Sequence, residues 1–365
     1  MKIGINGIIL MEKPAGIANL IIKTANYLVK TEEIIIYSNK ELNQDVLKRL
    51  DEKIRICILP MRILPNKTTL WLFFRLSKYL KKDEIDLFWC PNPWGPLFIS
   101  KKQKVLVTVH DFVCRDYRNT SGKIGIFLSD WLEKKTIKRA DKIWCVSQYT
   151  LDLLNQYYPF SKKKPVFVGQ ISEDIFKRIE ITDIEKKSLF DKLHINNNFM
   201  LFVGTIEPRK NLSFLLKLYK QYKGKLQLVI VGAKGWGNSY ISDIVNSEGF
   251  PRENVIFTGF ISNEDLVKLY NLATLYISTS LNEGFGLPQL EAMNCGCPVI
   301  SPHNSAMIEV VFGAGLTVKD WEIDSWLGAI YQCDNSRDEI ILRQNMRIKQ
   351  YMPEIVFPKL ENFIH

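Results

Sequence analysis

The chain has 365 residues, 46% of them hydrophobic, and carries a formal net charge of +10. Its length is above the size at which one hydrophobic core usually divides, which predicts two domains. An integral membrane protein is excluded, because no run approaches the roughly twenty apolar residues that a bilayer-spanning helix needs.

The chain opens directly on a strand-like run. Residues Met1–Gly7 lack the charged start, apolar stretch and small-residue cleavage site of a secretory signal, so we expect a cytoplasmic protein. A turn at Pro14–Ala18 precedes a helix predicted to run through Leu28. Gly16 in this turn could bring backbone N–H groups to a phosphate, and the alternative is an ordinary flexible turn.

Short apolar runs then alternate with helical patterns. The predicted strands of the first half are Ile34–Tyr37, Ile54–Leu59, Ile85–Trp89, Val105–Val109 and Lys142–Val146. Between them, Leu70–Leu80 has apolar residues at helical spacing, with Arg75 and three lysines on or beside the other face. We expect a crossover helix that covers a sheet, and membrane docking by the basic face is the alternative.

The positive charge is concentrated in the first half. Residues 1–170 carry 29 Lys and Arg against 16 Asp and Glu, whereas residues 171–365 carry 20 against 23. This asymmetry predicts attraction of the first half to an anionic partner: nucleic acid, a phosphorylated substrate or the inner face of a membrane.

The strand Val105–Val109 ends in His110 and Asp111. Ligands of open α/β sheets bind at the carboxyl ends of the strands, so His110 is a candidate to hydrogen-bond a substrate hydroxyl or to donate a proton. The alternative is a histidine whose ring is satisfied by loop backbone.

The second half repeats the alternation. Residues 171–198 are charged and weakly apolar, which suits a linker and a helix, and the strands that follow are Phe199–Val203, Leu226–Val231, Val255–Phe257, Leu275–Ser278 and Pro298–Ser301. Strands that alternate with helices predict a parallel sheet with right-handed crossovers in each half, that is, two Rossmann-like β/α/β domains.

The loop after Phe199–Val203 has the chemistry of an anion site. Gly204 allows close backbone approach, a helix opens at Leu212, and Arg209 and Lys210 add two positive charges beside the helix start. A diphosphate suits this arrangement, because cations at a helix N-terminus otherwise oppose the helix dipole. The alternative is a charged helix N-terminus exposed to water.

Two glutamates flank a second helix start. Glu283 is followed by Gly284, Phe285, Gly286 and Leu287, and a helix is predicted to begin near Pro288 and to carry Glu291 in its first turns. The glycine turn could present N–H donors to a phosphate or a sugar, and Glu291 could accept hydrogen bonds from ribose hydroxyls. Carboxylates that only balance the helix dipole are the alternative.

The seven cysteines do not indicate disulfides or a metal site. Their number is odd and their spacing irregular, and Cys295 and Cys297 are separated by one residue without a second pair or a histidine cluster nearby. We therefore expect neither disulfides nor a bound metal.

Taken together, these residues resemble glycosyltransferase family four, a retaining family with the GT-B fold. The resemblance covers most of the chain and is densest over Phe199–Gly315. Its motifs are Gly204-Thr205, Pro208–Asn211, Phe257–Ser262 and the pair Glu283 and Glu291 around Gly284–Pro288, with His110-Asp111 and Val146-Ser147 in the first half. Ala15 replaces the usual second glycine beside Gly16, and Ser305–Gly313 departs from the family's proline- and aspartate-richer pattern.

The resemblance implies a role for each matching residue. Arg209 and Lys210 would hold the diphosphate, Glu291 the ribose and Glu283 the donor sugar, with His110 and Asp111 placing the donor or the acceptor. The remaining donor-binding positions are implied to be Gly16, Gly204, Thr258, Phe260, Ile261, Gly284, Phe285, Gly286 and Leu287. The family retains the anomeric configuration and needs neither metal nor cofactor.

The resemblance also implies how the domains divide. Residues 1–170 would form an acceptor-binding domain and residues 171–350 a nucleotide-sugar-binding domain, with 351–365 crossing back onto the first. The patterns at Thr108–Tyr117 and Val231–Trp236 resemble bacterial enzymes of O-antigen and capsule synthesis, mannosyltransferases among them. We expect GDP-mannose as donor, a lipid-linked saccharide as acceptor, and peripheral contact with the anionic inner membrane face.

Another donor and another reaction on the same fold stay open as alternatives, whereas two other functional classes are disfavoured. The donor could be a UDP-sugar or a deoxysugar nucleotide, and an epimerase of the same fold could use the same site. A dinucleotide oxidoreductase is disfavoured because Gly4–Gly7 lacks the three-glycine fingerprint. No helix-turn-helix, zinc or aromatic RNA-binding motif is present, so we expect no nucleic-acid partner.

Overall fold

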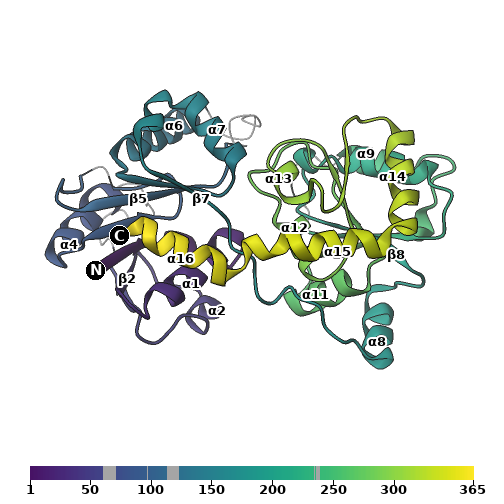
Figure 1. The fold of residues 1–365 in the computed structure, drawn as a ribbon, viewed down its shortest axis with the longest axis horizontal. Coiled ribbons are helices and arrows are strands. Elements are labelled where there is room, and N and C mark those ends of the chain that lie inside the picture. The colour runs from purple at the N-terminus through teal and green to yellow at the C-terminus, as the bar shows by residue number, and fades with distance from the viewer. Residues whose placement is uncertain (61–70, 97, 113–122, 234, 236–238) are drawn as a thin grey trace. The chain divides into compact units, whose positions relative to one another are not determined.

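The computed structural model describes residues 1–60, 71–96, 98–112, 123–233, 235 and 239–365. These residues form two compact units, one of Met1–Ile171 with Pro353–His365 and one of Ser172–Met352 (Figure 1). Both units are α/β structures built on a sheet in which every strand pair is parallel, which confirms the predicted fold class.

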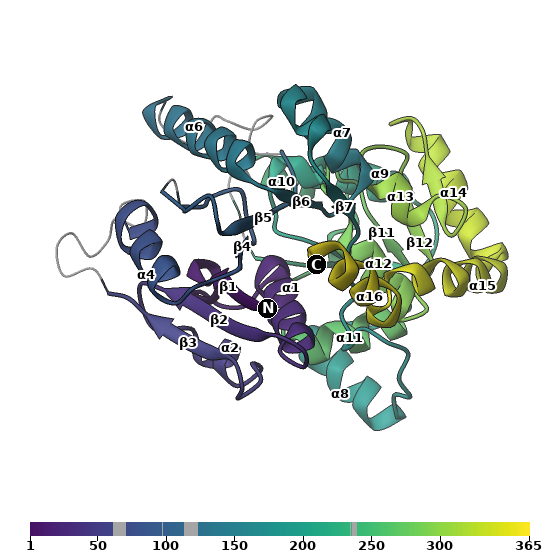
Figure 2. The same ribbon diagram turned by 60° about the vertical axis from the view of Figure 1, so that its left-hand side comes forward.

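The described part of the first unit holds a seven-stranded sheet in the order β3-β2-β1-β4-β5-β6-β7. Figure 2 shows β1, β2 and β3 side by side. The strands are β1 Lys2–Asn6, β2 Glu33–Ser38, β3 Arg55–Ile58, β4 Leu87–Cys90, β5 Lys104–Val109, β6 Lys142–Cys145 and β7 Val166–Val168. The helices are α1 Gly16–Leu28, α2 Gln44–Leu47, α4 Ser77–Lys82, α6 Lys123–Arg139, α7 Gln148–Tyr157 and α16 Pro353–Ile364, with 3-10 helices at Ile8–Met11 and Pro159–Lys163.

Alternate residues of each central strand enter different cores. Ile34 and Ile36 of β2 pack with α1 and α16 in one layer, whereas Ile35 and Tyr37 join α4 and α7 in the other. This division follows from the two-residue repeat of a strand whose two faces are both covered, and it explains why these strands are continuous apolar runs.

Helix α16 belongs to the first unit although it ends the chain. It lies beside α1 (Figure 1). Phe357 stacks on Tyr27 with ring centroids 4.2 Å apart, and the Tyr27 hydroxyl donates to Glu361. The C-terminal segment therefore completes a core that is formed mostly by residues before position 172.

The described part of the second unit holds a six-stranded sheet in the order β10-β9-β8-β11-β12-β13. The strands are β8 Phe199–Val203, β9 Gln227–Val231, β10 Val255–Gly259, β11 Leu275–Ile277, β12 Val299–Pro302 and β13 Leu316–Val318. The helices are α8 Asp183–Leu193, α9 Leu212–Gln221, α10 Ser239–Val245, α11 Asn263–Leu272, α12 Leu287–Asn294, α13 Met307–Val311, α14 Ile323–Asn335 and α15 Arg337–Arg347, with 3-10 helices at Pro208–Lys210, Arg252–Asn254 and Ile348–Tyr351.

The segment predicted as one helix over Leu70–Leu80 is irregular. Leu70 lies outside the described residues, a π-helix spans Trp71–Leu76, and α4 follows it. Leu76 and Leu80 are buried in the core against the sheet, while Lys81 and Lys82 are exposed. The segment therefore covers the sheet, as the crossover interpretation requires.

Some predicted features fall on residues that the structure does not describe. Cys114 is one, and the other six cysteines carry free thiols. Parts of the Thr108–Tyr117 and Val231–Trp236 patterns, namely 113–117, Lys234 and Trp236, also lie outside the described residues. Within the described part, no helix is long and apolar enough to cross a bilayer, and no three His, Cys, Asp or Glu side chains gather as metal ligands.

Candidate functional site

Two loops of the second unit meet where the strand order reverses. The sheet runs outward from β8 in one direction and from β11 in the other, so the loops after these two strands are neighbours at the switch point. They are joined by hydrogen bonds: Leu281 N–H donates to the Arg209 carbonyl, and the Thr279 hydroxyl donates to the Lys210 carbonyl. The predicted anion loop and the Glu283 loop therefore form one site.

Lys210 is buried in this site. Only 8% of the residue is exposed, and its side chain runs across Gly204. A Cβ at position 204 would lie 3.1 Å from the Lys210 Cε, a tight contact that would oblige the lysine side chain to shift by a few tenths of an ångström. The alternative of a helix start exposed to water is therefore wrong for Lys210.

Glu283 forms ion pairs with Arg209 and Lys210, the two cations of the loop after β8. Its two carboxylate oxygens accept from Arg209 Nη1 and Lys210 Nζ, each at 2.5 Å. Burial opposes ionisation of this carboxyl, but the charges of Lys210 and Arg209 outweigh it, so the pKa of Glu283 lies below its ordinary value of 4.5. The carboxylate balances two cations that could otherwise pair with a bound anion.

Glu207 is a further member that the sequence did not indicate. Its Oε1 accepts from Arg209 Nε at 3.1 Å and from Nη2 at 2.6 Å, while Arg209 Nη1 donates to the Asn282 carbonyl at 3.0 Å. The guanidinium is thus fixed on three sides, which gives it a defined direction before any ligand binds. In the sequence, the only indication of this role is that a glutamate precedes Arg209 by two residues.

The loop after β12 supports Glu283 from the other side. Glu283 N–H donates to the Ser305 hydroxyl at 3.2 Å, and Asn304 Nδ2 donates to the Leu281 carbonyl at 3.1 Å. Ser305 has a positive φ of 47°, an uncommon conformation for a residue with a side chain. The departure from the family pattern at Ser305–Gly313 thus begins in a residue that positions Glu283.

Glu291 lies on α12, and within the described residues its carboxyl has one hydrogen-bond partner. The Tyr270 hydroxyl of α11 donates to Glu291 Oε2 at 3.0 Å. Burial raises the pKa of Glu291 to about 7, and the Tyr270 hydrogen bond and the Lys210 charge offset only part of that rise. The carboxyl is therefore near half-ionised at neutral pH and can accept further hydrogen bonds from a ligand.

The turn between the two glutamates is closely packed. Phe285 is buried edge-on against Tyr351, with ring centroids 5.3 Å apart, and Gly286 adopts a positive φ of 113° where α12 begins at Leu287. The Phe285 ring is engaged in packing, and Gly286 has no side chain that could contact a ligand. Any contribution of Gly284–Leu287 to binding would come from backbone, as predicted.

Three of the implied donor-binding positions, Thr258, Phe260 and Ile261, lie at or just after the end of β10. The Thr258 hydroxyl donates to the Gly259 carbonyl at 3.0 Å, Phe260 is 65% exposed and Ile261 is half-buried. The Gly259 carbonyl accepts from Gly232 N–H at 3.0 Å, which joins this loop to the one after β9. Thr258, Phe260 and Ile261 therefore lie at the same carboxyl edge of the sheet as Gly204.

The other predicted residues belong to the first unit. Gly16 is exposed and is the first residue of α1, whose N-terminus has no side-chain cap, and Asp111 is exposed after β5. His110 Nε2 is 2.7 Å from the Pro91 carbonyl, so loop backbone satisfies one ring nitrogen. Burial lowers the pKa of His110 despite that hydrogen bond and the nearby Asp111. A neutral ring that donates from Nε2 keeps Nδ1 as an acceptor.

Comparisons with family models cover most of the chain. Residues 14–169 match the model described as Glycosyltransferase Family 4, and residues 184–343 match the model described as Glycosyl transferases group 1. The Glu207–Asn211 loop, Glu283 and Glu291 all lie in the second match, whereas Gly16, His110 and Asp111 lie in the first.

Several relatives are mannosyltransferases by description. The chain is 35% identical over 161 residues to O-antigen chain mannosyltransferase B of Escherichia coli, covering 42% of each protein. It is 32% identical over 179 residues to the serotype-specific mannosyltransferase WbdA of Escherichia coli, covering 48% of this chain and 22% of WbdA. It is 26% identical over 260 residues to O-antigen chain mannosyltransferase RfbU of Salmonella typhimurium, covering 71% and 67%. The chain thus spans less than half the length of the first two.

Solved structures share the fold over the whole chain. Sucrose-phosphate synthase from Thermosynechococcus elongatus has a TM-score of 0.75 at 16% identity and covers 100% of this chain and 98% of its own. Anabaena HepE in complex with UDP and glucose has a TM-score of 0.75 at 18% identity and covers 100% and 99%. Likeness at such low identity establishes the fold alone, and it confirms the predicted GT-B fold.

Proposed function

The chain belongs to the glycosyltransferases, with a Glycosyltransferase Family 4 domain followed by a Glycosyl transferases group 1 domain, and we propose that it transfers mannose from GDP-mannose to a lipid-linked saccharide. The reaction retains the anomeric configuration and uses neither metal nor cofactor. The O-antigen chain mannosyltransferases among its relatives support mannose as the sugar and a saccharide chain as the acceptor. The proposed setting is bacterial surface polysaccharide synthesis in the cytoplasm, at the inner face of the membrane.

The observation that carries the proposal is the cluster of Arg209, Lys210 and Glu283 at the switch point of the second sheet. Two cations held on one carboxylate can exchange part of that pairing for the two phosphates of a nucleotide sugar. Glu283 then becomes available to accept hydrogen bonds from the donor sugar. Glu291, with its remaining acceptor capacity, is suited to the ribose hydroxyls.

The proposed transfer breaks the bond between C1 of mannose and the diphosphate oxygen. The acceptor hydroxyl oxygen forms the new bond to C1 on the same face, and its proton passes to the departing diphosphate. Arg209 and Lys210 stabilise the charge that develops on the leaving group, a contribution of roughly 3 to 4 kcal/mol for a single well-placed donor in comparable sites. Neutral His110 suits the orientation of a hydroxyl better than the donation of a proton.

A thermal-shift panel tests the donor and the absence of a metal requirement. GDP-mannose with EDTA is expected to raise Tm, because a ligand that binds only the folded state stabilises it by mass action. UDP-sugars and dTDP-deoxysugars should give smaller shifts at equal concentration. A larger shift with a UDP-sugar would replace GDP-mannose as the donor, and loss of every shift in EDTA would refute metal independence.

Product identification separates transfer from epimerisation. The protein with GDP-mannose and a lipid-linked saccharide should give an α-linked mannosyl product, because mannose is α-linked in the donor and the configuration is retained. Conversion of the nucleotide sugar to an epimer without acceptor would indicate the alternative enzyme of the same fold.

Glu207 is predicted to act through Arg209. Glu207→Ala should lower kcat/KM roughly 10- to 100-fold, which corresponds to a total loss of about 1.5 to 3 kcal/mol, the range for one hydrogen bond to a charged group. Glu207→Gln, which keeps an acceptor oxygen, should recover part of the loss. Steady-state transfer kinetics measure both, with exposed Glu253→Ala as the matched control. Equal activity of Glu207→Ala and wild type would contradict the positioning role.

A further inference from the structure

Helix α6 presents a basic stripe that the proposed reaction does not use. Trp131, Lys134, Lys135 and Lys138 follow the i, i+3, i+4, i+7 spacing of one helix face, and all four are exposed. The opposite face is buried through Leu132, Thr136, Ile137 and Ala140. The lysines are therefore held outward by a helix that is anchored in the core.

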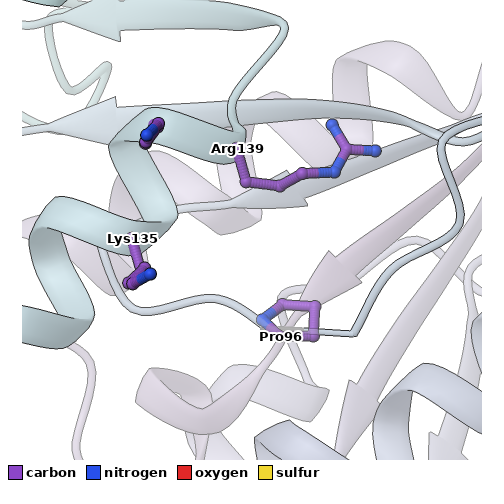
Figure 3. Close-up of a pocket in the computed structure, with 4 residues that line it drawn as sticks. Pro96, Lys135 and Arg139 are labelled. Atoms are coloured by element: carbon purple, nitrogen blue, oxygen red, sulfur yellow. The ribbon is translucent and has the colours of Figure 1, made fainter.

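A pocket of about 300 Å³ opens beside this stripe and is lined by Pro96, Lys135, Lys138 and Arg139. Figure 3 shows Lys135 and Arg139 on the helix and Pro96 on the facing loop. Arg139 is already held by Asp141 at 2.8 Å and by the Gln103 carbonyl at 2.7 Å. The cations available to a ligand are thus Lys135 and Lys138, and within the described part of the chain neither forms an ion pair.

Two further lysine pairs converge on the same end of α6. Arg139 Nη2 donates to the Ser100 carbonyl, next to exposed Lys101 and Lys102. Lys164 Nζ donates to the Lys138 carbonyl at 3.1 Å, which brings exposed Lys162 and Lys163 to the helix end. Of the carboxylates nearby, Glu133 accepts from the Tyr158 hydroxyl and Asp141 pairs with Arg139, while Asp130 lies four residues before Lys134 on the same helix.

This cluster, the α6 basic face, lies away from the predicted site residues of its unit. Lys101 and Lys102 precede β5 and Lys162 and Lys163 precede β7, so they lie at the amino edge of the parallel sheet. His110 follows β5 at the carboxyl edge. An anionic surface could engage the α6 basic face and leave the carboxyl edge accessible.

Two exposed aromatic side chains accompany these lysines. Trp131 is 37% exposed and carries Lys135 Nζ 5.8 Å from its ring centroid, and Phe98, on the loop between Pro96 and Ser100, is 62% exposed. Tryptophan favours the headgroup level of bilayers, and lysines spread over several segments suit a plane of phosphates better than one compact anion.

We propose that the α6 basic face docks on an anionic phospholipid bilayer, with a lipid phosphate seated between Lys135 and Lys138. The choice of a membrane rests on the proposed lipid-linked acceptor, whereas the surface itself rests on the charges and contacts described above. The proposal gives the excess positive charge of residues 1–170 a defined location.

Vesicle co-sedimentation of the full chain tests the proposal. Wild type should bind phosphatidylglycerol vesicles at low salt, lose most binding in about 0.5 M NaCl and ignore neutral phosphatidylcholine vesicles. The triple variant Lys134→Gln, Lys135→Gln, Lys138→Gln should bind anionic vesicles roughly 100-fold more weakly, since each lysine near such a surface contributes about fivefold. The control Lys48→Gln, Lys53→Gln, Lys225→Gln removes the same charge from exposed positions elsewhere and should bind within a few-fold of wild type.

Undiminished binding of the first variant, equal loss in the control, or equal binding to neutral vesicles would each overturn the proposal. Thermal shifts with GDP-mannose should be the same in all three proteins. A failure of donor binding therefore leaves this surface untouched, and a failure of docking leaves the donor site untouched.

Discussion

Lys210→Met should lower kcat/KM for mannosyl transfer by a factor of roughly 100 to 1000, the range seen when one charge-stabilising donor is removed from an active site. Methionine keeps the apolar stem that crosses Gly204 but removes the ammonium that pairs with Glu283 at 2.5 Å. The diphosphate then departs with only Arg209 to stabilise its charge. Steady-state kinetics with GDP-mannose and a lipid-linked acceptor measure the loss.

The same change should alter stability in a pH-dependent way. Burial raises the pKa of Glu283, but nearby positive charges hold it below 4.5. The charge of Lys210 makes the larger contribution and that of Arg209 the smaller one. A carboxyl with a lowered folded pKa stabilises the protein above its unfolded pKa, and that contribution is lost as pH falls through the folded value. The stability gap between wild type and Lys210→Met should therefore be greatest at neutral pH and shrink below about pH 4.5.

Lys217→Met is the matched control for this prediction. Lys217 lies on α9, seven residues further along, and its side chain is exposed. It should retain wild-type kcat/KM and Tm. If Lys210→Met stayed folded and kept wild-type kcat/KM, Lys210 would not face the leaving group, and the cluster with Glu283 would be structural.

The fold could be predicted because its main strands are fully buried. Runs such as Ile34–Tyr37 and Leu228–Val231 are apolar throughout, which is the pattern of a sheet covered on both faces. Strands β7 and β13 were missed because each has only three residues and most of them are partly exposed. The π-helix at Trp71–Leu76 could not be anticipated, since apolar spacing does not separate it from an α-helix.

The sequence predicted the site residues within single loops, but it did not predict the contacts between those loops. Arg209 and Lys210 lie on one loop and Glu283 on another, and nothing in either loop indicates that the two cations pair with that carboxylate in the absence of a ligand. The contact depends on the strand order, which places β8 beside β11. Tyr270 was missed for the same reason, because its hydrogen bond to Glu291 depends on how α11 packs on α12.

His110 shows where a sequence pattern leaves both interpretations standing. The strand-end position favoured a role at the site, and the hydrogen bond from its ring to the Pro91 carbonyl matches the structural alternative. This hydrogen bond engages only one nitrogen of the imidazole ring, and the other nitrogen can still accept a hydrogen bond. Its assignment to a substrate hydroxyl stays a prediction.

Glu291→Gln should raise the Tm of the unliganded protein at pH 8 while reducing the shift produced by GDP-mannose. Burial raises the pKa of Glu291 to about 7. A carboxyl with a raised folded pKa contributes most below its unfolded value of 4.5, and that contribution disappears as pH rises through about 7. At pH 8 the buried charge costs roughly 1 to 3 kcal/mol, which glutamine removes while still accepting from Tyr270.

Donor affinity should change with pH in the opposite sense to stability. Ribose hydroxyls donate to the ionised carboxylate, so Kd for GDP-mannose should rise roughly tenfold between pH 8 and pH 6 as Glu291 takes up a proton. Isothermal titration calorimetry at several pH values measures this pH dependence of Kd. The dependence should be absent in Glu291→Gln and unchanged in the control Glu264→Gln, whose side chain is exposed. A normal donor shift in Glu291→Gln would mean that the ribose binds elsewhere. The buried carboxyl would then destabilise the protein without serving the donor, a cost that its hydrogen bond to Tyr270 alone does not explain.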